Sequence, residues 1–318
     1  MWSWPAKYRQ PLEHPTPALP LPLPLHLPLR LPMRHALLAL AVVAVWGSNF
    51  VIIKVALHTF SPLWLGVLRF TLALLPAAFF LARPAVPWQK LAAYGVLIGA
   101  GQFGLLYIAI NGHITPGMVS LVVQMQVFFT IGLAMLADGE KLRPCQFVAL
   151  GLATAGIAVI ALHTGGDITL LGLVLVLLAG LSWSGGNQVA RSMGRVPMLP
   201  MVVWSSAYAV PVLLALALWF EGPARLTQAV TAADAMTWAA VVWQAAGNTL
   251  FGYAAWGWLL ARHPAATVVP MALLVPVFGM GASSLLLGEA LPPWKLAAAA
   301  LVMGGLAVNL WWPRADQD

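Results

Sequence analysis

Apolar residues form long unbroken runs along the chain, and short polar segments separate one run from the next. A helix needs roughly 20 apolar residues to cross the hydrocarbon core of a bilayer, which is the length of these runs. The alternation typical of membrane β-barrel strands is missing, because Leu, Ala and Val follow one another without a period of two. The pattern therefore predicts an all-α integral membrane protein. We place its ten transmembrane helices at 36–57, 62–82, 89–110, 116–136, 145–162, 170–190, 199–219, 237–259, 265–286 and 294–312.

The composition supports this class. Of the 318 residues, 61% are hydrophobic and 8% are charged, and the mean hydropathy is +0.87. A single cysteine excludes a disulfide within the chain and a cysteine-rich metal site, and we expect neither a metal nor a cofactor. The net charge of +7 does not indicate a nucleic-acid partner, because the basic residues are dispersed between hydrophobic runs. The partner that the composition implies is the lipid bilayer.

The distribution of Lys and Arg predicts the orientation. With the N-terminus in the cytoplasm, twelve of the sixteen fall on the cytoplasmic side, Arg225 and Lys295 fall outside, and Lys54 and Arg69 lie within spans. Such a positive-inside bias predicts that both termini are cytoplasmic.

The two ends of the chain differ from the spans. Residues 1–33 alternate Pro with Leu, and because proline lacks the donor that a helix needs, we predict a disordered cytoplasmic tail. This tail lacks the small-residue cleavage site of a signal peptide. Met33 is a second candidate translation start, which would make the tail an over-long gene start. Residues 313–318 form a short cytoplasmic tail at the other end.

The chain also repeats itself. The matching segments are 139–144 with 288–293, both Gly-Glu hairpins ending in proline, 155–159 with 304–308, 100–102 with 246–248, and Tyr107 with Tyr253. They define a first five-helix repeat at 34–162 and a second at 163–312. Because five is an odd number, the second repeat enters the membrane with the opposite orientation. Inverted-topology repeats let two halves exchange inward and outward shapes around a site at the midplane.

Several motifs resemble one transporter family. Trp46-Gly47-Ser48-Asn49-Phe50 with Lys54, Leu68-Arg69-Phe70, and the two Gly-Glu hairpins resemble the EamA-type drug/metabolite transporters. Val203-Trp204-Ser205 and Leu274-Val275-Pro276-Val277 place the chain nearest to the branch that exports O-acetylserine and cysteine from bacteria. The resemblance covers residues 34–312. It implies a multi-pass exporter of small metabolites in the bacterial inner membrane.

Arg69 is the strongest pointer to function. It lies about a third of the way into the predicted span 62–82, where an arginine costs several kcal/mol unless it faces protein, water or a ligand. Every Asp and Glu maps to a tail, a loop or a span end, so no carboxylate is expected at its depth. Two roles stay open: the side chain reaches the headgroups or caps a neighbouring helix end, or it waits in an aqueous cavity for an anionic group. The position matching Arg69 in the second repeat is near Ala207, which favours a functional role.

Other polar and aromatic residues within the spans are candidates for the same site. Lys54 either snorkels to the interface or adds a second positive charge at the outer mouth. The remaining candidates either hold helices together or contact the substrate, and they are the amides Asn49, Gln102, Gln124, Asn187 and Asn248 and the tryptophans Trp46 and Trp204.

These features lead to a transport hypothesis. We expect export of a zwitterionic amino acid by alternating access, with its carboxylate on Arg69 and its amino group near the amide oxygens of Asn49 and Gln102. Without an aspartate or glutamate inside a span, we expect efflux down the substrate gradient or weak proton coupling through a histidine. Two fused halves make a monomer sufficient, and a dimer is not excluded.

Two other functions are compatible with parts of the sequence. The fifteen tryptophans suggest a broad exporter of aromatic amino acids, drugs or toxic metabolites. Ser283, Ser284 and His263 could provide the nucleophile and base of an intramembrane enzyme, but their spacing follows no motif and catalysis does not explain a duplication.

Overall fold

The computed structural model describes residues 31–138 and 144–311, and these residues fold as helices joined by short turns. Residues 139–143 of the first hairpin, residues 1–30 of the predicted tail 1–33, and the predicted tail 313–318 lie outside the described residues, so what was predicted for them stays a prediction. Eleven continuous helical segments are present in the described part of the chain.

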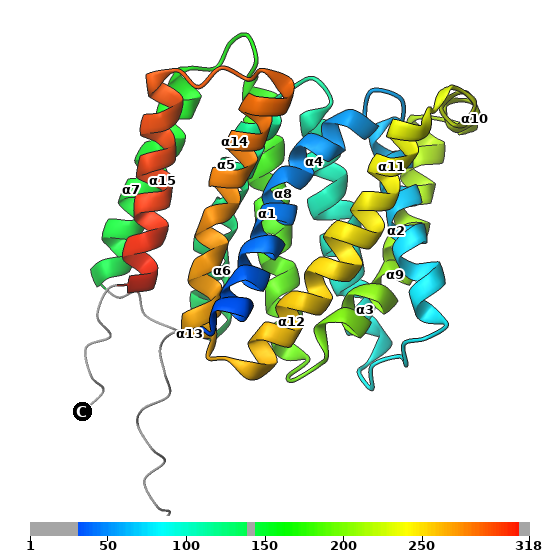
Figure 1. The fold of residues 1–318 in the computed structure, drawn as a ribbon, viewed down its shortest axis with the longest axis horizontal. Helices are drawn as coiled ribbons and strands as arrows, with labels where there is room; N and C mark the ends of the chain where they lie inside the picture. Colours follow the sequence, from blue (N-terminus) through cyan, green and yellow to red (C-terminus); the bar gives the residue numbers. More distant parts are fainter. Residues whose placement is uncertain (1–30, 139–143, 312–318) are drawn as a thin grey trace, which may run out of the picture. The chain divides into compact units, whose positions relative to one another are not determined.

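The first half contains five of these segments (Figure 1). In order they are α1 (Met33–Ala56), α2 (Pro62–Ala78), α3 (Trp88–Gly95) continued by η1 (Val96–Gly104) and α4 (Leu105–Ile110), α5 (Pro116–Val122) continued by η2 (Val123–Met125) and α6 (Gln126–Asp138), and α7 (Pro144–Leu162).

The second half contains the other six. They are α8 (Leu170–Ser192), α9 (Met198–Phe220), α10 (Pro223–Ala232), α11 (Ala235–Trp243) continued by η3 (Gln244–Phe251) and α12 (Gly252–Arg262), α13 (Ala265–Val268) continued by η4 (Val269–Leu274) and α14 (Val275–Leu287), and α15 (Pro293–Trp311).

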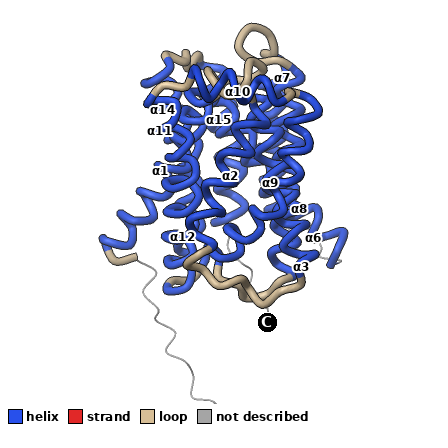
Figure 2. Tube along the Cα trace, turned by 90° about the vertical axis from the view of Figure 1, so that its right-hand side faces the viewer, coloured by secondary structure: helices blue, strands red, loops and turns tan. Residues whose placement is uncertain are grey.

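Within residues 31–138 and 144–311, eight helices are long and apolar enough to cross a bilayer. Two expected spans are not among these eight. The predicted span 62–82 forms the shorter helix α2, and the predicted span 237–259 forms the continuous run α11–η3–α12. The helix α10 was not predicted, because its polar sequence was assigned to a loop. Figures 1 and 2 show that α10 lies across the direction of the neighbouring helices, at one end of them.

Local sequence explains where the helices begin and end. Proline occupies the first position of α2, α5 and α10, where its missing N–H costs nothing. The Thr169 hydroxyl accepts the N–H of Gly172 at the start of α8, and the Asp234 carboxylate accepts that of Thr237 at the start of α11. Gly288 ends α14 in the left-handed conformation with φ of 69°, which favours glycine.

The duplication is visible in the interruptions of the helices. The third span of the first half contains the π-helix η1, and its counterpart in the second half contains the π-helix η3. The equivalent residues Gln102 and Asn248 lie within these two π-helices. The next helix along the chain contains the 3₁₀ segment η2 in the first half and η4 in the second. Because such segments inside long helices often mark functional sites or hinges, their repetition indicates that both halves share one design.

The packing partners also follow the duplication. Each of α2 and α7 packs against its own counterpart, α9 and α15 (Figure 1). The helix α1 packs against α14, and the equivalent pair α8 and α6 packs in the same way. This exchange of partners is what a two-fold relation between the halves produces.

The pair α7 and α15 shows the relation at single residues. A Cβ atom on Gly156 would lie 2.7 Å from Val302 and 3.0 Å from the carbonyl oxygen of Ala298. A Cβ atom on the equivalent Gly305 would lie 2.5 Å from the carbonyl oxygen of Ala149. Both glycines therefore let the two backbones approach closely, as small residues do in membrane helix pairs.

We expect Gly305→Ala to destabilise the protein by about 1–3 kcal/mol, because the added methyl group must push the two helices apart. The thermal unfolding temperature in detergent measures this loss. The matched control is Gly304→Ala, since a Cβ atom on Gly304 meets nothing within 4 Å. Equal unfolding temperatures for the two variants would refute the close-approach role of Gly305.

Candidate functional site

The side chain of Arg69 is enclosed by protein. It lies on α2 with an exposed fraction of 0%. Its Nη1 donates to the Tyr107 hydroxyl at 2.9 Å, and its Nη2 donates to Oγ1 of Thr249 at 3.1 Å. The guanidinium carbon lies 3.6 Å from the centre of the Phe103 ring and 4.9 Å from that of Phe70. In this conformation Arg69 is therefore held by protein groups, and its contact with an anionic substrate stays a prediction.

The charge of Arg69 has no carboxylate counterion in the described part of the chain. The ion pair found there joins two other residues, Lys295 and Glu289. A buried charge without an opposite charge is costly. The cation–π contact with Phe103 offsets part of this cost, because the ring face is negative. The site therefore holds a positive charge that its protein contacts do not neutralise.

Two hydroxyl groups connect Arg69 to Gln244. The Tyr107 hydroxyl accepts from Arg69 and donates to Oε1 of Gln244 at 2.6 Å. The Thr249 hydroxyl accepts from Arg69 and donates to the backbone oxygen of Gln244 at 2.9 Å. Because arginine can only donate, each hydroxyl is left to donate its own proton to Gln244. This network ties α2 and α4 of the first half to η3 of the second.

Four buried polar atoms near these helices have no hydrogen-bond partner among the described residues. Two are donors, Nε of Arg69 and Nε2 of Gln244, and two are acceptors, Oδ1 of Asn49 and Oε1 of Gln102. Their helices adjoin one another, because α2 packs against η1 and η3, and α1 packs against η3. An unpaired buried polar group costs about 1–3 kcal/mol, so four of them together need an explanation. Oγ1 of Thr267 is unpaired as well, on α13.

Other predicted site residues lie on the surfaces between these helices. The Trp46 indole donates to the backbone oxygen of Asn248 at 3.2 Å, which joins α1 to η3. The same ring packs against Trp256 with a centroid separation of 5.1 Å. Nζ of Lys54 donates to the backbone oxygen of Ile110 at the end of α4, at 3.2 Å.

Three predicted residues have separate surroundings. The Asn187 amide donates to Oε1 of Gln126 at 3.1 Å, which joins α8 to α6. The Trp204 indole donates to the backbone oxygen of Leu81 at 2.9 Å, after the end of α2. Gln124 is buried within η2. No described contact joins these three to Arg69, and their part in substrate binding stays a prediction.

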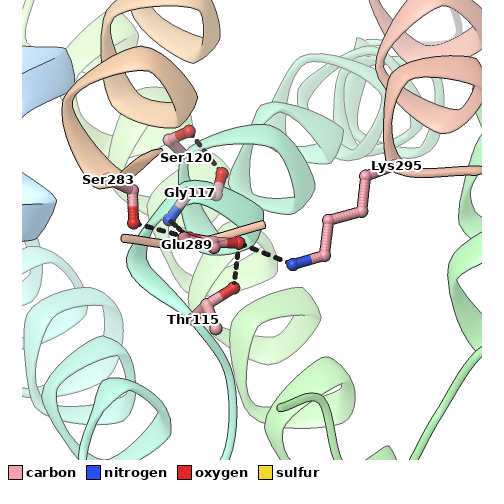
Figure 3. A network of polar contacts seen from close by, with 6 residues as sticks. All are labelled: Thr115, Gly117, Ser120, Ser283, Glu289 and Lys295. Carbon is pink, nitrogen blue, oxygen red and sulfur yellow. Dashed lines mark hydrogen bonds and ion pairs between the residues drawn. The ribbon is translucent and has the colours of Figure 1, made fainter. Parts of the chain in front are cut away.

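The second Gly-Glu hairpin holds a buried network. The Glu289 carboxylate accepts from the hydroxyls of Thr115 and Ser283, from the N–H of Gly117 and from Nζ of Lys295 (Figure 3). Burial alone would raise the pKa of Glu289, but these hydrogen bonds and the charge of Lys295 lower it below the usual value. The hairpin thus connects α14 to α15, and its carboxylate also binds the start of α5.

The sequence profile of the EamA-like transporter family matches residues 33–162 and again residues 170–311. The chain belongs to the EamA-like transporter family. The two matches coincide with the two halves described above. EamA proteins are transporters and not enzymes, which removes the intramembrane enzyme from consideration. Ser283, the proposed nucleophile, donates to Glu289.

Two relatives are similar to this chain over nearly their whole length. A probable amino-acid metabolite efflux pump of Salmonella typhimurium is 40% identical over 87% of this chain and 95% of its own. A probable amino-acid metabolite efflux pump of Escherichia coli is 38% identical over 89% of this chain and 97% of its own. A solved crystal structure has the same fold, with a TM-score of 0.62 over 90% of this chain and 98% of that chain, at 19% identity.

Several residues that contact Arg69 or its hydrogen-bond partners were not expected from the sequence. From the sequence, Tyr107 was identified only as a repeated residue, and Gln244, Thr249 and Phe103 were not named as site residues. The repetition of Tyr107 as Tyr253, within glycine-rich spans, was the available signal. Nothing in the sequence distinguished Thr249 from the other threonines.

We expect Tyr107→Phe to lower the free energy of unfolding by about 1–3 kcal/mol, because Nη1 of Arg69 and Oε1 of Gln244 both lose their partner. Thermal unfolding in detergent measures the change. Tyr94→Phe is the matched control, since Tyr94 lies in the same run of helix, is also buried and has no hydrogen bond to a described residue. A loss of the same size in both variants would contradict the bridging role.

Proposed function

We propose that this EamA transporter exports small zwitterionic amino-acid metabolites, with cysteine and O-acetylserine as the model substrates. It does so across a bacterial inner membrane, by alternating access of ten spans arranged as two inverted five-helix repeats. The names of the two similar efflux pumps support the substrate class. The exchange of packing partners and the repeated π and 3₁₀ segments support the two-repeat architecture.

The observation that carries the proposal is the set of four unpaired buried atoms. An α-amino acid offers a carboxylate, which only accepts, and an ammonium group, which only donates. The unpaired donors of Arg69 and Gln244 complement the carboxylate, and the unpaired oxygens of Asn49 and Gln102 complement the ammonium group. One bound zwitterion would therefore satisfy donors and acceptors together and neutralise the charge of Arg69.

The network around Arg69 orients it for this task. Tyr107 and Thr249 occupy one hydrogen of each terminal nitrogen, and the Nε edge stays free. A carboxylate that approaches this edge forms charge-assisted hydrogen bonds, which are stronger than neutral ones. The Trp46 indole belongs to α1 and lies beside Asn248 of η3, where it provides an apolar wall for the substrate.

Access to a site as buried as this one requires the halves to move. The repeated interruptions of the helices provide two equivalent pairs of places at which the helices can bend, with one member of each pair in each half. Since no carboxylate of the described residues contacts Arg69, we propose efflux down the substrate gradient rather than exchange for protons at this site. Both termini lie in the cytoplasm in this arrangement, as the positive-inside bias predicts.

We expect Arg69→Ala to lower kcat/KM for export of cysteine and O-acetylserine by about 10–100-fold, the value of a charge-assisted hydrogen bond. Asn49→Ala should cause a smaller loss, because one neutral acceptor is removed. Counterflow of labelled substrate in proteoliposomes measures both. The control is Arg83→Ala, which removes an exposed arginine of the connection between α2 and α3.

The same assay tests labelled tryptophan as a substrate and a hydrophobic cation as a competitor. Full transport by the Arg69→Ala variant, or competition by the cation as strong as that by cysteine, would refute the zwitterion site and favour a broad drug exporter.

A further inference from the structure

A cavity lies apart from Arg69, at the ends of the same helices. Its volume is about 570 Å³, and it is open to the surroundings. His58 after the end of α1, Ser61 before α2 and Asn111 after α4 line one side. Arg225 and Gln228 of α10 line the other. The volume is in the range of cavities that hold small molecules.

The helices connect this cavity to the proposed zwitterion site. Asn49, Arg69 and Gln102 lie on α1, α2 and η1–α4, the three segments whose ends border the cavity. Ser61 precedes Arg69 by eight residues, which is about 12 Å along a helix. The buried residues Leu57 and Phe60 form the floor of the cavity on the side of the site.

The cavity carries a positive charge that is available to a ligand. Arg225 is exposed and has no hydrogen bond or ion pair with any residue that the structure describes. None of the residues that line the cavity is acidic. A guanidinium group in such a position attracts anions and binds carboxylates through its planar fork.

The carboxylates near the cavity already accept hydrogen bonds from the first residues of helices. Glu221 accepts from the Ser61 hydroxyl at 2.6 Å and from the N–H groups of Leu63 and Trp64 at 2.9 and 3.1 Å. It therefore caps α2. Asp234 accepts from the N–H and the hydroxyl of Thr237 at 2.8 and 2.7 Å, and caps α11. Both carboxylates bind groups of the protein rather than Arg225, so Arg225 remains available to a ligand.

We propose that this cavity is a release vestibule, a second and weaker subsite in which Arg225 binds the carboxylate of the departing amino acid. The inference rests on the proposed function and adds a binding step to it. Asn111 and Gln228 provide amide groups for the rest of the polar end of the substrate. An anionic lipid headgroup offers similar chemistry, and the experiment separates the two sources.

The vestibule can be tested with a single cysteine. Cys145 is removed as Cys145→Ala, and Gln228→Cys then places a thiol in the cavity. An anionic sulfonate thiol reagent and a cationic trimethylammonium reagent are compared in detergent. We expect Arg225→Gln to lower the anionic-to-cationic rate ratio by about three- to ten-fold, because the local attraction of anions is lost. The control Arg195→Gln, in the exposed connection between α8 and α9, should leave the ratio unchanged.

Added ligands identify the occupant. O-acetylserine should slow the anionic reagent, whereas phosphatidylglycerol added to the micelles should not. A ratio insensitive to Arg225→Gln, or protection by the lipid alone, would overturn the vestibule.

Transport provides the second readout. In oriented proteoliposomes, Arg225→Gln should raise KM several-fold for substrate offered on the α10 side, with kcat from that side preserved. Because passive transport has the same kcat/KM in both directions, substrate offered on the opposite side should show an unchanged KM and a kcat lowered by the same factor, as slower release predicts. Arg225→Lys should retain part of the effect. Unchanged KM on both sides, with transport still dependent on Arg69, would overturn the vestibule and leave the proposed function standing. No transport of O-acetylserine or cysteine by the wild type would overturn both.

Discussion

The buried guanidinium group of Arg69 constrains the rest of the structure. Its charge has no carboxylate beside it in the described chain, so two hydroxyls and an aromatic ring must make its burial tolerable. Those groups come from different helices and from both halves. The protein therefore brings α2, α4 and η3 together at one point, where Nε of Arg69 and Nε2 of Gln244 have no hydrogen-bond partner among the described residues. Under the proposed function, substrate binding offsets this cost.

A symmetric frame surrounds an asymmetric site. The glycines at 156 and 305, the paired π-helices and the exchange of packing partners repeat in both halves. Arg69 does not repeat, because the equivalent position is near Ala207. This division of roles is physically reasonable. A frame that must adopt two shapes gains from equivalent halves, whereas an amino acid has different ends and needs different partners for each.

Much of the frame could be predicted from the sequence, and less of the site. The apolar runs gave the helices, and the two Gly-Glu hairpins revealed the duplication. The missing counterion of Arg69 followed from the positions of the acidic residues. Thr249 could not be found, because its role depends on which helix faces α2. The π-helices were also invisible, since their wider turns depend on packing between helices rather than on local propensity. The hydrogen bond from the Trp204 indole to the oxygen of Leu81 could not be predicted either, because it depends on how α9 packs against α2.

The most direct test of the central claim compares ligands that differ only in the carboxylate. Cysteine and its decarboxylated analogue cysteamine share the amino and thiol groups, so only cysteine can neutralise Arg69. A ligand that binds the folded state raises the unfolding temperature, and this shift measures binding without transport. Our account predicts that cysteine stabilises the wild-type protein, that cysteamine at equal concentration does not, and that Arg69→Ala abolishes the difference. Equal stabilisation by both compounds would show that the buried guanidinium does not recognise the cargo.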